Sequence, residues 1–168
     1  MIIRKLTKYD AEDYRQIRLE AFYKNPDSFG TSYSEEKIKT IEQFQDRIPE
    51  NNNNFILGCF EDKKLIGIVA FQQESRIKLR HKAYISRMYV QQEYRRKGIG
   101  KLLLLNELIE RAKAINEVEI LLLDIVKINF LAKQLYLSLG FQIYGIEKMA
   151  YKFNNQYFDL ELMCLQIK

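Results

Sequence analysis

The sequence predicts a single α/β domain in which a mixed central sheet of about seven strands packs against about four helices. A strand-like run, a glycine turn, a leucine-rich helix and a second apolar strand follow one another at residues 83–125, which is the order of a βαβ unit. Antiparallel strands are expected on both sides of this unit, which adds α+β character. The 168 residues suffice for one domain, residues 1–168, that buries roughly two-thirds of its unfolded surface.

A short strand and a helix open the chain. The strand is expected at residues 2–6, and Thr7 or Asp10 can cap the helix that follows. Pro26, within 25–27, ends this helix. Its apolar side includes Tyr14, Ile17, Ala21 and Phe22.

A second helix is expected before the first long strand. Ser34 stands at its cap with acidic residues in the first turn, and the helix should run to about Arg47, shortly before Pro49. Three antiparallel strands are then expected at 55–61, 64–74 and 83–90, the first two joined by a tight turn at 62–63.

The stretch 95–100 predicts a phosphate-binding turn. Gly98 and Gly100 allow consecutive backbone N–H groups to face an anion, and the helix that follows adds its positive N-terminal end. Arg95, Arg96 and Lys97 add full charges. Neither a Walker A loop nor a dinucleotide-binding glycine fingerprint is present in the sequence.

The rest of the chain predicts two helices and three strands. The helix at 101–115 leads to a strand at 118–125 that should lie parallel to 83–90. A helix at 129–139 should end with Gly140 at its C′ position. Strands at 141–153 and 157–166, joined by a turn at 154–155, close the sheet.

The composition limits the classes of function. Lys and Arg number 27 against 22 Asp and Glu, and the scattered cations argue against a nucleic-acid-binding domain. We expect a cytoplasmic protein without membrane contact, because no signal segment is present and no apolar run approaches the roughly 18 residues of a membrane span. Cys59 and Cys164 lack CxxC spacing and a neighbouring histidine, so two buried thiols and no metal site are expected.

Two motifs together resemble the GCN5-related N-acetyltransferase (GNAT) family. The first is Arg95-x-x-Gly98-x-Gly100, after a strand that ends at Met88-Tyr89-Val90. The second begins about thirty residues later and reads Asn129-x-x-Ala132-x-x-Leu135-Tyr136-x-x-Leu139-Gly140-Phe141. The order of elements is similar to that family over nearly the whole chain.

The resemblance implies a sheet splayed into a V that holds acetyl-CoA as co-substrate. It implies transfer of the acetyl group to a primary amine of a small molecule, an amino acid or a protein, by direct attack in a ternary complex. Positioning and stabilisation of an oxyanion by a backbone N–H of strand 83–90 should dominate catalysis. The cofactor-binding residues that it implies are Met88, Tyr89, Val90, Arg95, Arg96, Lys97, Gly98, Ile99, Gly100, Lys101, Asn129 and Tyr136.

Asn129 and Tyr136 are expected to reach one extended ligand. Seven residues separate them, which places them two turns, or roughly 10.5 Å, apart on one helix face. The resemblance implies that Asn129 contacts the cofactor and that Tyr136 protonates the departing thiolate. A capping role for Asn129 and a core role for Tyr136 are the alternatives.

The general base is left open by the sequence. Relatives place a glutamate near the position of Tyr84 or Ser86, and this chain has none there. The sole histidine, His81, is expected at an exposed edge, and a water chain is a further alternative. The other candidates, each expected to be a surface carboxylate, are Glu20, Glu35, Glu36 and Glu74.

The acceptor amine is not identified by the sequence. The resemblance bounds its site by residues 25–36 and 152–159, where Asp159 could attract a cation. A homodimer is left open. The competing functions are a non-catalytic acyl-CoA-binding module and, less consistent with the dispersed charge, a nucleic-acid-binding domain.

Overall fold

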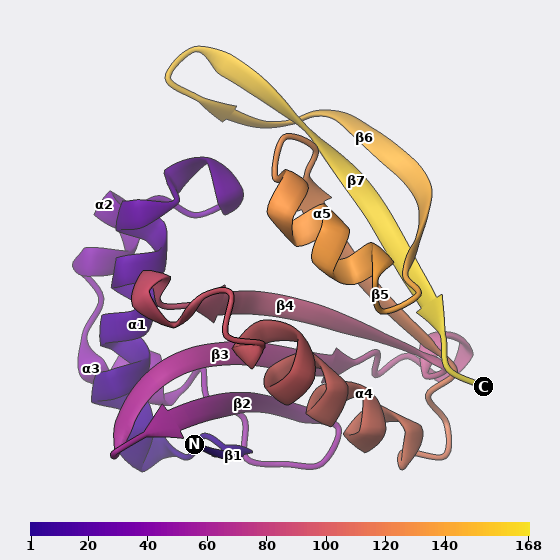
Figure 1. The fold of residues 1–168 in the computed structure, drawn as a ribbon, viewed down its shortest axis with the longest axis horizontal. Helices are drawn as coiled ribbons and strands as arrows, with labels where there is room; N and C mark the ends of the chain where they lie inside the picture. Colours follow the sequence, from indigo (N-terminus) through magenta and orange to yellow (C-terminus); the bar gives the residue numbers. More distant parts are fainter.

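A computed structural model describes residues 1–168, except for the side chains of residues 101–103. Its seven strands form one sheet in the order β1-β2-β3-β4-β5-β7-β6 (Figure 1). All neighbours are antiparallel except β4 and β5, which are parallel as the βαβ pattern predicts. The strands are β1 Ile2–Lys5, β2 Asn54–Glu61, β3 Lys64–Gln73, β4 Lys82–Val90, β5 Ile120–Val126, β6 Gln142–Phe153 and β7 Gln156–Gln166.

Five α-helices accompany the sheet, and the predicted fold class is confirmed. A π-helical segment, Ile99–Leu105, leads directly into α4, where one regular helix over 101–115 is predicted. π-helical turns are rare and occur frequently at functional sites. The α-helices are α1 Ala11–Lys24, α2 Tyr33–Lys37, α3 Ile41–Gln45, α4 Asn106–Lys113 and α5 Phe130–Leu137.

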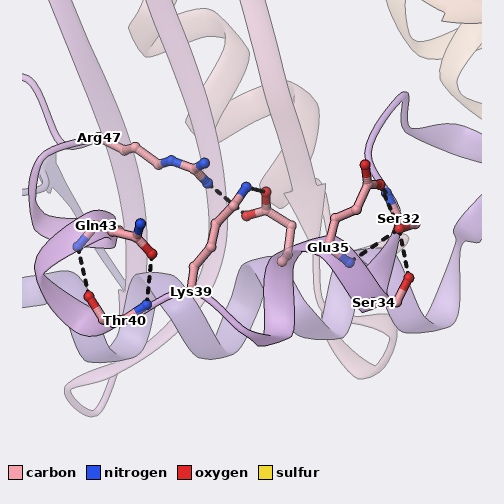
Figure 2. Close-up of polar contacts among 8 residues, drawn as sticks. Ser32, Ser34, Glu35, Lys39, Thr40, Gln43 and Arg47 are labelled. Carbon is pink, nitrogen blue, oxygen red and sulfur yellow. Dashed lines mark hydrogen bonds and ion pairs between the residues drawn. The ribbon is translucent and has the colours of Figure 1, made fainter.

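The single helix predicted from Ser34 to Arg47 is wrong, because the segment forms two short helices. Ser32, not Ser34, caps α2, and its side chain exchanges hydrogen bonds with Glu35 (Figure 2). Thr40 caps α3 in the same way with Gln43. A second capping box inside the segment starts a new helix there, which the helical periodicity does not reveal.

The sheet divides into two arms between β4 and β5 (Figure 1). Three residue pairs join these strands, over 82–84 and 120–122. Beyond them, β5 continues along β7, while β4 continues along β3 through a bulge at which Arg87 has φ of 56°. Because a bulge bends its strand and increases its twist, it helps β4 to turn away from β5.

Separate apolar layers cover the two faces of the arm formed by β1, β2, β3 and β4. One layer packs the sheet against α4 and extends under α5, and includes Phe55, Leu57, Phe71, Leu104, Leu108, Leu123, Tyr136 and Met163. The other packs the opposite face against α1 and α3, and includes Tyr14, Ile17, Ala21, Phe44, Ile56, Ile68 and Tyr89. Within the described part of the chain, no helix has the length and apolar character needed to cross a membrane.

Asp10 fastens the start of α1 to β1. Its carboxylate accepts hydrogen bonds from the Thr7 backbone N–H at 2.8 Å and from both Nη atoms of Arg4 at 2.6 and 2.8 Å. The Arg4 guanidinium hydrogen bond, followed by the Thr7 bonds, holds the pKa of Asp10 below its usual value against the opposing effect of burial.

We predict that Asp10→Asn lowers the free energy of unfolding by about 1 to 2 kcal/mol at pH 7. Because folding depresses the pKa of Asp10, the ionised carboxylate stabilises the fold above its ordinary value of 3.8, and this contribution is lost as pH falls through the lower native pKa. Urea titrations between pH 7 and pH 2.5 measure the effect. The two proteins should converge at the acid end, whereas Asp62→Asn, in an exposed left-handed turn position, should match the wild type throughout.

Candidate active site

The end of β4 presents a free backbone edge to the opening between the two arms of the sheet. Met88, Tyr89 and Val90 lie beyond the three pairs that join β4 to β5, so their edge on that side has no strand neighbour. Tyr89 and Val90 are buried, and Met88 packs against the apolar layer below α4. Backbone groups on such an edge can hydrogen-bond an extended ligand as a strand would.

A partly buried polar network fixes β4 to α1. Glu20 accepts hydrogen bonds from the Tyr89 hydroxyl at 3.0 Å and from Gln91 Nε2 at 2.7 Å, and pairs with Lys24 at 3.1 Å. Burial, and then the hydrogen bond to Glu20, raise the pKa of Tyr89 to about 12. Glu20 therefore positions β4, and its two oxygens are already occupied.

Arg95 is directed back toward the protein. Its Nε donates to the Val90 carbonyl at 2.9 Å and its Nη2 donates to Asn25 Oδ1 at 3.1 Å, while the guanidinium lies 5.3 Å from the Tyr89 ring centroid. These contacts join the end of β4 to the end of α1. Arg95 therefore holds the start of the turn against β4 and α1 through these hydrogen bonds, and it also adds a positive charge.

The predicted phosphate-binding turn has an unusual backbone. Arg96 and Gly98 have φ of 62° and 81°, both in the left-handed region. Ile99 anchors the turn in the core, and the Lys97 ammonium lies 5.2 Å from the Tyr94 ring centroid. Left-handed residues within a turn can direct successive N–H groups to one side, which favours an anion.

Gly100 is the next of the predicted cofactor-binding residues in this turn. A Cβ on Gly100 would come within 3.0 Å of Met88 Cε, so the glycine lets the turn approach β4 closely. The side chain of Lys101 lies outside the described residues.

Asn129 and Tyr136 occupy α5 as the sequence predicts. Asn129 caps the helix, its Oδ1 accepting the Ala132 N–H at 3.2 Å, so the capping alternative is present. Tyr136 is 5% exposed, and its ring meets Phe141 edge-on at 5.6 Å. Burial, and then the charge of Asp124, raise the pKa of Tyr136, and its hydroxyl bonds to no residue that the structure describes. Gly140, with φ of 92°, stands one position later than predicted, because α5 ends at Leu137.

Asp124 is a site residue that the sequence reasoning missed. It lies on β5 beyond the last pair with β4, and its charge acts on Tyr136. Although its side chain is exposed, the surrounding protein raises the carboxyl pKa by desolvation and through Glu147, while a hydrogen bond from Tyr151 opposes the shift. A single acid within the apolar run 120–126 is the signal that could have identified it.

A cavity of about 550 Å³ lies between the N-terminal helices and the final hairpin. It coincides with the region bounded by 25–36 and 152–159. Tyr151 joins the cavity to Asp124, and its ring lies so close to Gly30 that a Cβ there would be 3.1 Å away. The aromatic side chains lining the cavity are Phe22, Tyr23, Phe29, Tyr33, Tyr151, Phe153 and Phe158.

The carboxylates considered as bases from the sequence have other partners. Glu35 bonds to Ser32, and Glu74 pairs with Arg76 at 3.1 Å. Glu36 is buried and pairs with Lys39 and Arg47, which contradicts the expected surface position. Asp159 pairs with Lys148 at 2.8 Å and does not line the cavity among the described residues. Asp124 is therefore the carboxylate best placed in the opening.

Comparison with protein families matches residues 3–162 to the family model described as an acetyltransferase (GNAT) domain. The chain belongs to the GNAT family of acetyltransferases. A search of curated proteins finds no match. The family assignment agrees with the splayed sheet and with the glycine turn beside β4.

Solved structures share this GNAT fold. A GNAT acetyltransferase from Streptococcus pneumoniae has 24% identity and a TM-score of 0.85, with 99% of each chain covered. The yncA protein of Salmonella typhimurium, solved with acetyl-CoA, has 21% identity and a TM-score of 0.81, with 100% of this chain and 94% of that chain covered. The ribosomal-protein-S18-alanine N-acetyltransferase of Escherichia coli has 20% identity and a TM-score of 0.75, with 99% and 94% covered.

The residues beside β4 fit the coenzyme that the GNAT family uses. The free β4 edge suits an amide-bearing chain, and the left-handed turn at 96–98 suits a pyrophosphate. A side chain at position 100 would fill the space between this turn and Met88. A thioester bound there would supply an activated acetyl group.

We predict that Gly98→Ala costs about 1 kcal/mol of unfolding free energy, because alanine is strained at φ of 81°. It should also weaken coenzyme A binding, measured by calorimetry. Gly145→Ala is the control, since its Cβ would meet only ordinary contacts at 3.4 Å. Equal stability and affinity in the two variants would contradict a strained phosphate turn.

Proposed function

We propose that this GNAT domain transfers the acetyl group of acetyl-CoA to a primary amine bound in the cavity between the N-terminal helices and the final hairpin. The supporting observation is the free edge of β4 beside the glycine turn, with Tyr136 of α5 and Asp124 of β5 near enough to each other that the charge of Asp124 raises the pKa of Tyr136. One is a neutral proton donor and the other a carboxylate. Together they can manage both protons that an amine transfer requires.

Tyr136 is suited to act as the general acid. Burial and the neighbouring charge of Asp124 raise its pKa, so the hydroxyl is protonated throughout the neutral range. Its hydroxyl bonds to no described residue and is available to a ligand. A thiol has a pKa near 8.5, so donation from Tyr136 would assist the departure of a thiolate without being indispensable.

Asp124 is suited to act as the general base, directly or through one water. Its raised pKa makes the carboxylate a better proton acceptor than an ordinary aspartate. Tyr151 lines the cavity and is close enough to Asp124 for each to shift the pKa of the other, so Asp124 lies near the residues that would surround an amine in the cavity. The carboxylate missing from β4 at Tyr84 and Ser86 is thus replaced from the opposite arm of the sheet.

The main alternative is a non-catalytic acyl-CoA-binding module. It predicts acetyl-CoA binding without acetyl-dependent release of coenzyme A in the presence of small amines, amino acids or peptide N-termini. Failure to bind acetyl-CoA would contradict both functions, whereas turnover with any amine in that panel would exclude the module.

We predict that Tyr136→Phe lowers kcat by about 10²-fold while acetyl-CoA affinity stays the same. Because the hydroxyl has no partner among the described residues, its removal should leave the melting temperature within about 2 °C of the wild type. Steady-state release of coenzyme A and thermal unfolding measure the two effects. An unchanged kcat would remove Tyr136 from the mechanism.

We predict that Asp124→Asn lowers kcat/KM by about 10²-fold and removes the acid limb of its pH profile. In the wild type, kcat/KM should fall as pH decreases through the raised pKa of Asp124, since protonation abolishes the base. Asp46→Asn, at the exposed end of α3, is the matched control. A variant that keeps the acid limb would show that another group accepts the proton.

A further inference from the structure

We infer that the acceptor carries an aromatic ring close to its primary amine, and that the cavity between the N-terminal helices and the final hairpin binds this ring. The inference rests on the proposed function, because it names the chemical class of the acceptor bound in the same cavity. Three observations support it: the side chains that line the cavity, the charges among them, and the position of the cavity relative to Asp124.

Aromatic side chains line the cavity on both sides. On one side are Phe22, Phe29 and Tyr33, from α1 and the residues up to the start of α2. On the other side are Phe153 of β6 and Phe158 of β7. Tyr33 and Phe153 are each 37% exposed, so the core does not use the whole of either ring. Exposed apolar groups gathered around one hollow are typical of a ligand site.

Two aromatic pairs in the cavity favour a ring over an aliphatic chain. The rings of Phe22 and Phe29 meet at 81° with centroids 5.3 Å apart, and the rings of Tyr23 and Tyr33 meet at 63° and 5.5 Å. All four residues line the cavity. A further ring can join such pairs edge-on or offset, which are the arrangements that aromatic rings prefer, whereas a saturated chain gains only burial.

The cavity is larger than a small aliphatic amine requires. Its volume of about 550 Å³ falls within the range of roughly 300 to 1,000 Å³ that is usual for ligand sites. A short alkylamine would leave most of the aromatic wall in contact with water. A bound ring would remove apolar surface of both the ligand and the wall from water, which stabilises the complex.

The charges in the cavity favour a cationic acceptor over an anionic one. Among the residues that the structure describes, the charged ones that line the cavity are Asp27, Glu35 and Lys152. The Glu35 carboxylate accepts a hydrogen bond from the Ser32 hydroxyl at 2.6 Å (Figure 2), and the Lys152 ammonium lies 5.1 Å from the Tyr157 ring centroid. Because carboxylates outnumber ammonium groups here, an amine that arrives protonated is attracted, and an acceptor with its own carboxylate is disfavoured.

The hairpin side of the cavity adjoins the proposed base. Phe158 and Tyr151 line the cavity and belong to the apolar cluster that includes Val126 of β5. Val126 and Asp124 lie on the same face of β5, because alternate residues of a strand point the same way. A ring bound beside Phe158 therefore needs only a short linker for its amine to approach Asp124.

The test uses the full chain with saturating acetyl-CoA and compares phenylethylamine, cyclohexylethylamine and butylamine as acceptors. We expect kcat/KM for phenylethylamine to exceed that for butylamine by about 10²-fold, mainly through KM, because the ring adds about four apolar carbons. It should exceed the value for cyclohexylethylamine by about 3-fold or more, since only the aromatic ring makes edge-on and offset ring contacts. Release of coenzyme A measures each value.

Variants on both sides of the cavity test where the ring binds. Tyr33→Ala and Phe153→Ala should each lower the phenylethylamine-to-butylamine ratio by about 5- to 10-fold. Tyr9→Ala is the matched control, because Tyr9 is 99% exposed and is not among the described residues that line the cavity, and it should keep the wild-type ratio. The two cavity variants lie on different elements, so a folding defect in one leaves the other as a test.

The ring can belong to a free amine or to the N-terminal residue of a peptide, and both forms present the same chemistry to the cavity. Two tripeptides that differ only in beginning with phenylalanine or alanine separate these sources. A preference for the phenylalanine peptide that exceeds the preference for phenylethylamine assigns the ring to a peptide, and the reverse assigns it to a free amine. Either result supports the inference.

Several results would overturn the inference and leave amine transfer intact. They are a phenylethylamine-to-butylamine ratio near one, equal values for phenylethylamine and cyclohexylethylamine, and an unchanged ratio in both cavity variants. Faster transfer to diaminobutane than to phenylethylamine would also overturn it, because the aromatic walls would then bind a second ammonium group.

Absence of transfer to every amine contradicts the proposed function instead. Calorimetry of phenylethylamine and butylamine with the coenzyme A complex then tests the ring site on its own. Tighter binding of phenylethylamine that is weakened in Tyr33→Ala would support the site, and equal binding of the two amines would overturn it.

Discussion

The short contact between β4 and β5 is the constraint on which the rest of the structure depends. Three residue pairs hold the two arms of the sheet together, and the strands separate immediately afterwards. The separation leaves the β4 edge unpaired beside the glycine turn, and it exposes Asp124 on β5. A sheet paired along its full length would have filled both positions with backbone hydrogen bonds and left no room for a thioester.

The elements with strong local signals could be predicted from the sequence. The parallel pairing of β4 and β5 follows from the apolar run 120–126 after a glycine turn. The hairpin turns at 62–63 and 154–155 have positive φ, which Asp62, Asn154 and Asn155 tolerate. The split between α2 and α3 could not be predicted as readily, because Thr40 and Gln43 also fit the interior of one helix. The break is stabilised by the Thr40–Gln43 capping box and by the burial of Glu36, which pairs with Lys39 and Arg47 in the folded protein.

Only the part of the candidate site that lies in sequence motifs could be predicted from the sequence. Motif residues such as Gly98 and Tyr136 lie where their motifs place them, because each motif is local in sequence. Asp124 and the aromatic residues of the cavity belong to no motif, and their significance arises from side chains brought together by distant elements. Arg95 shows the same limit, since its contacts with Val90 and Asn25 depend on how α1 meets the end of β4.

The two short helices α2 and α3 have a consequence for how this enzyme can change over time. Each begins at its own capping box, so the bonds that start each helix are made by residues next to each other in the sequence. Residues 29–35, which lead into and begin α2, line the cavity, so substitutions there can reshape one wall of the cavity while β4 and the glycine turn keep their geometry. If the cavity binds the acceptor as proposed, such changes would alter acceptor preference between relatives that retain the same acetyl donor.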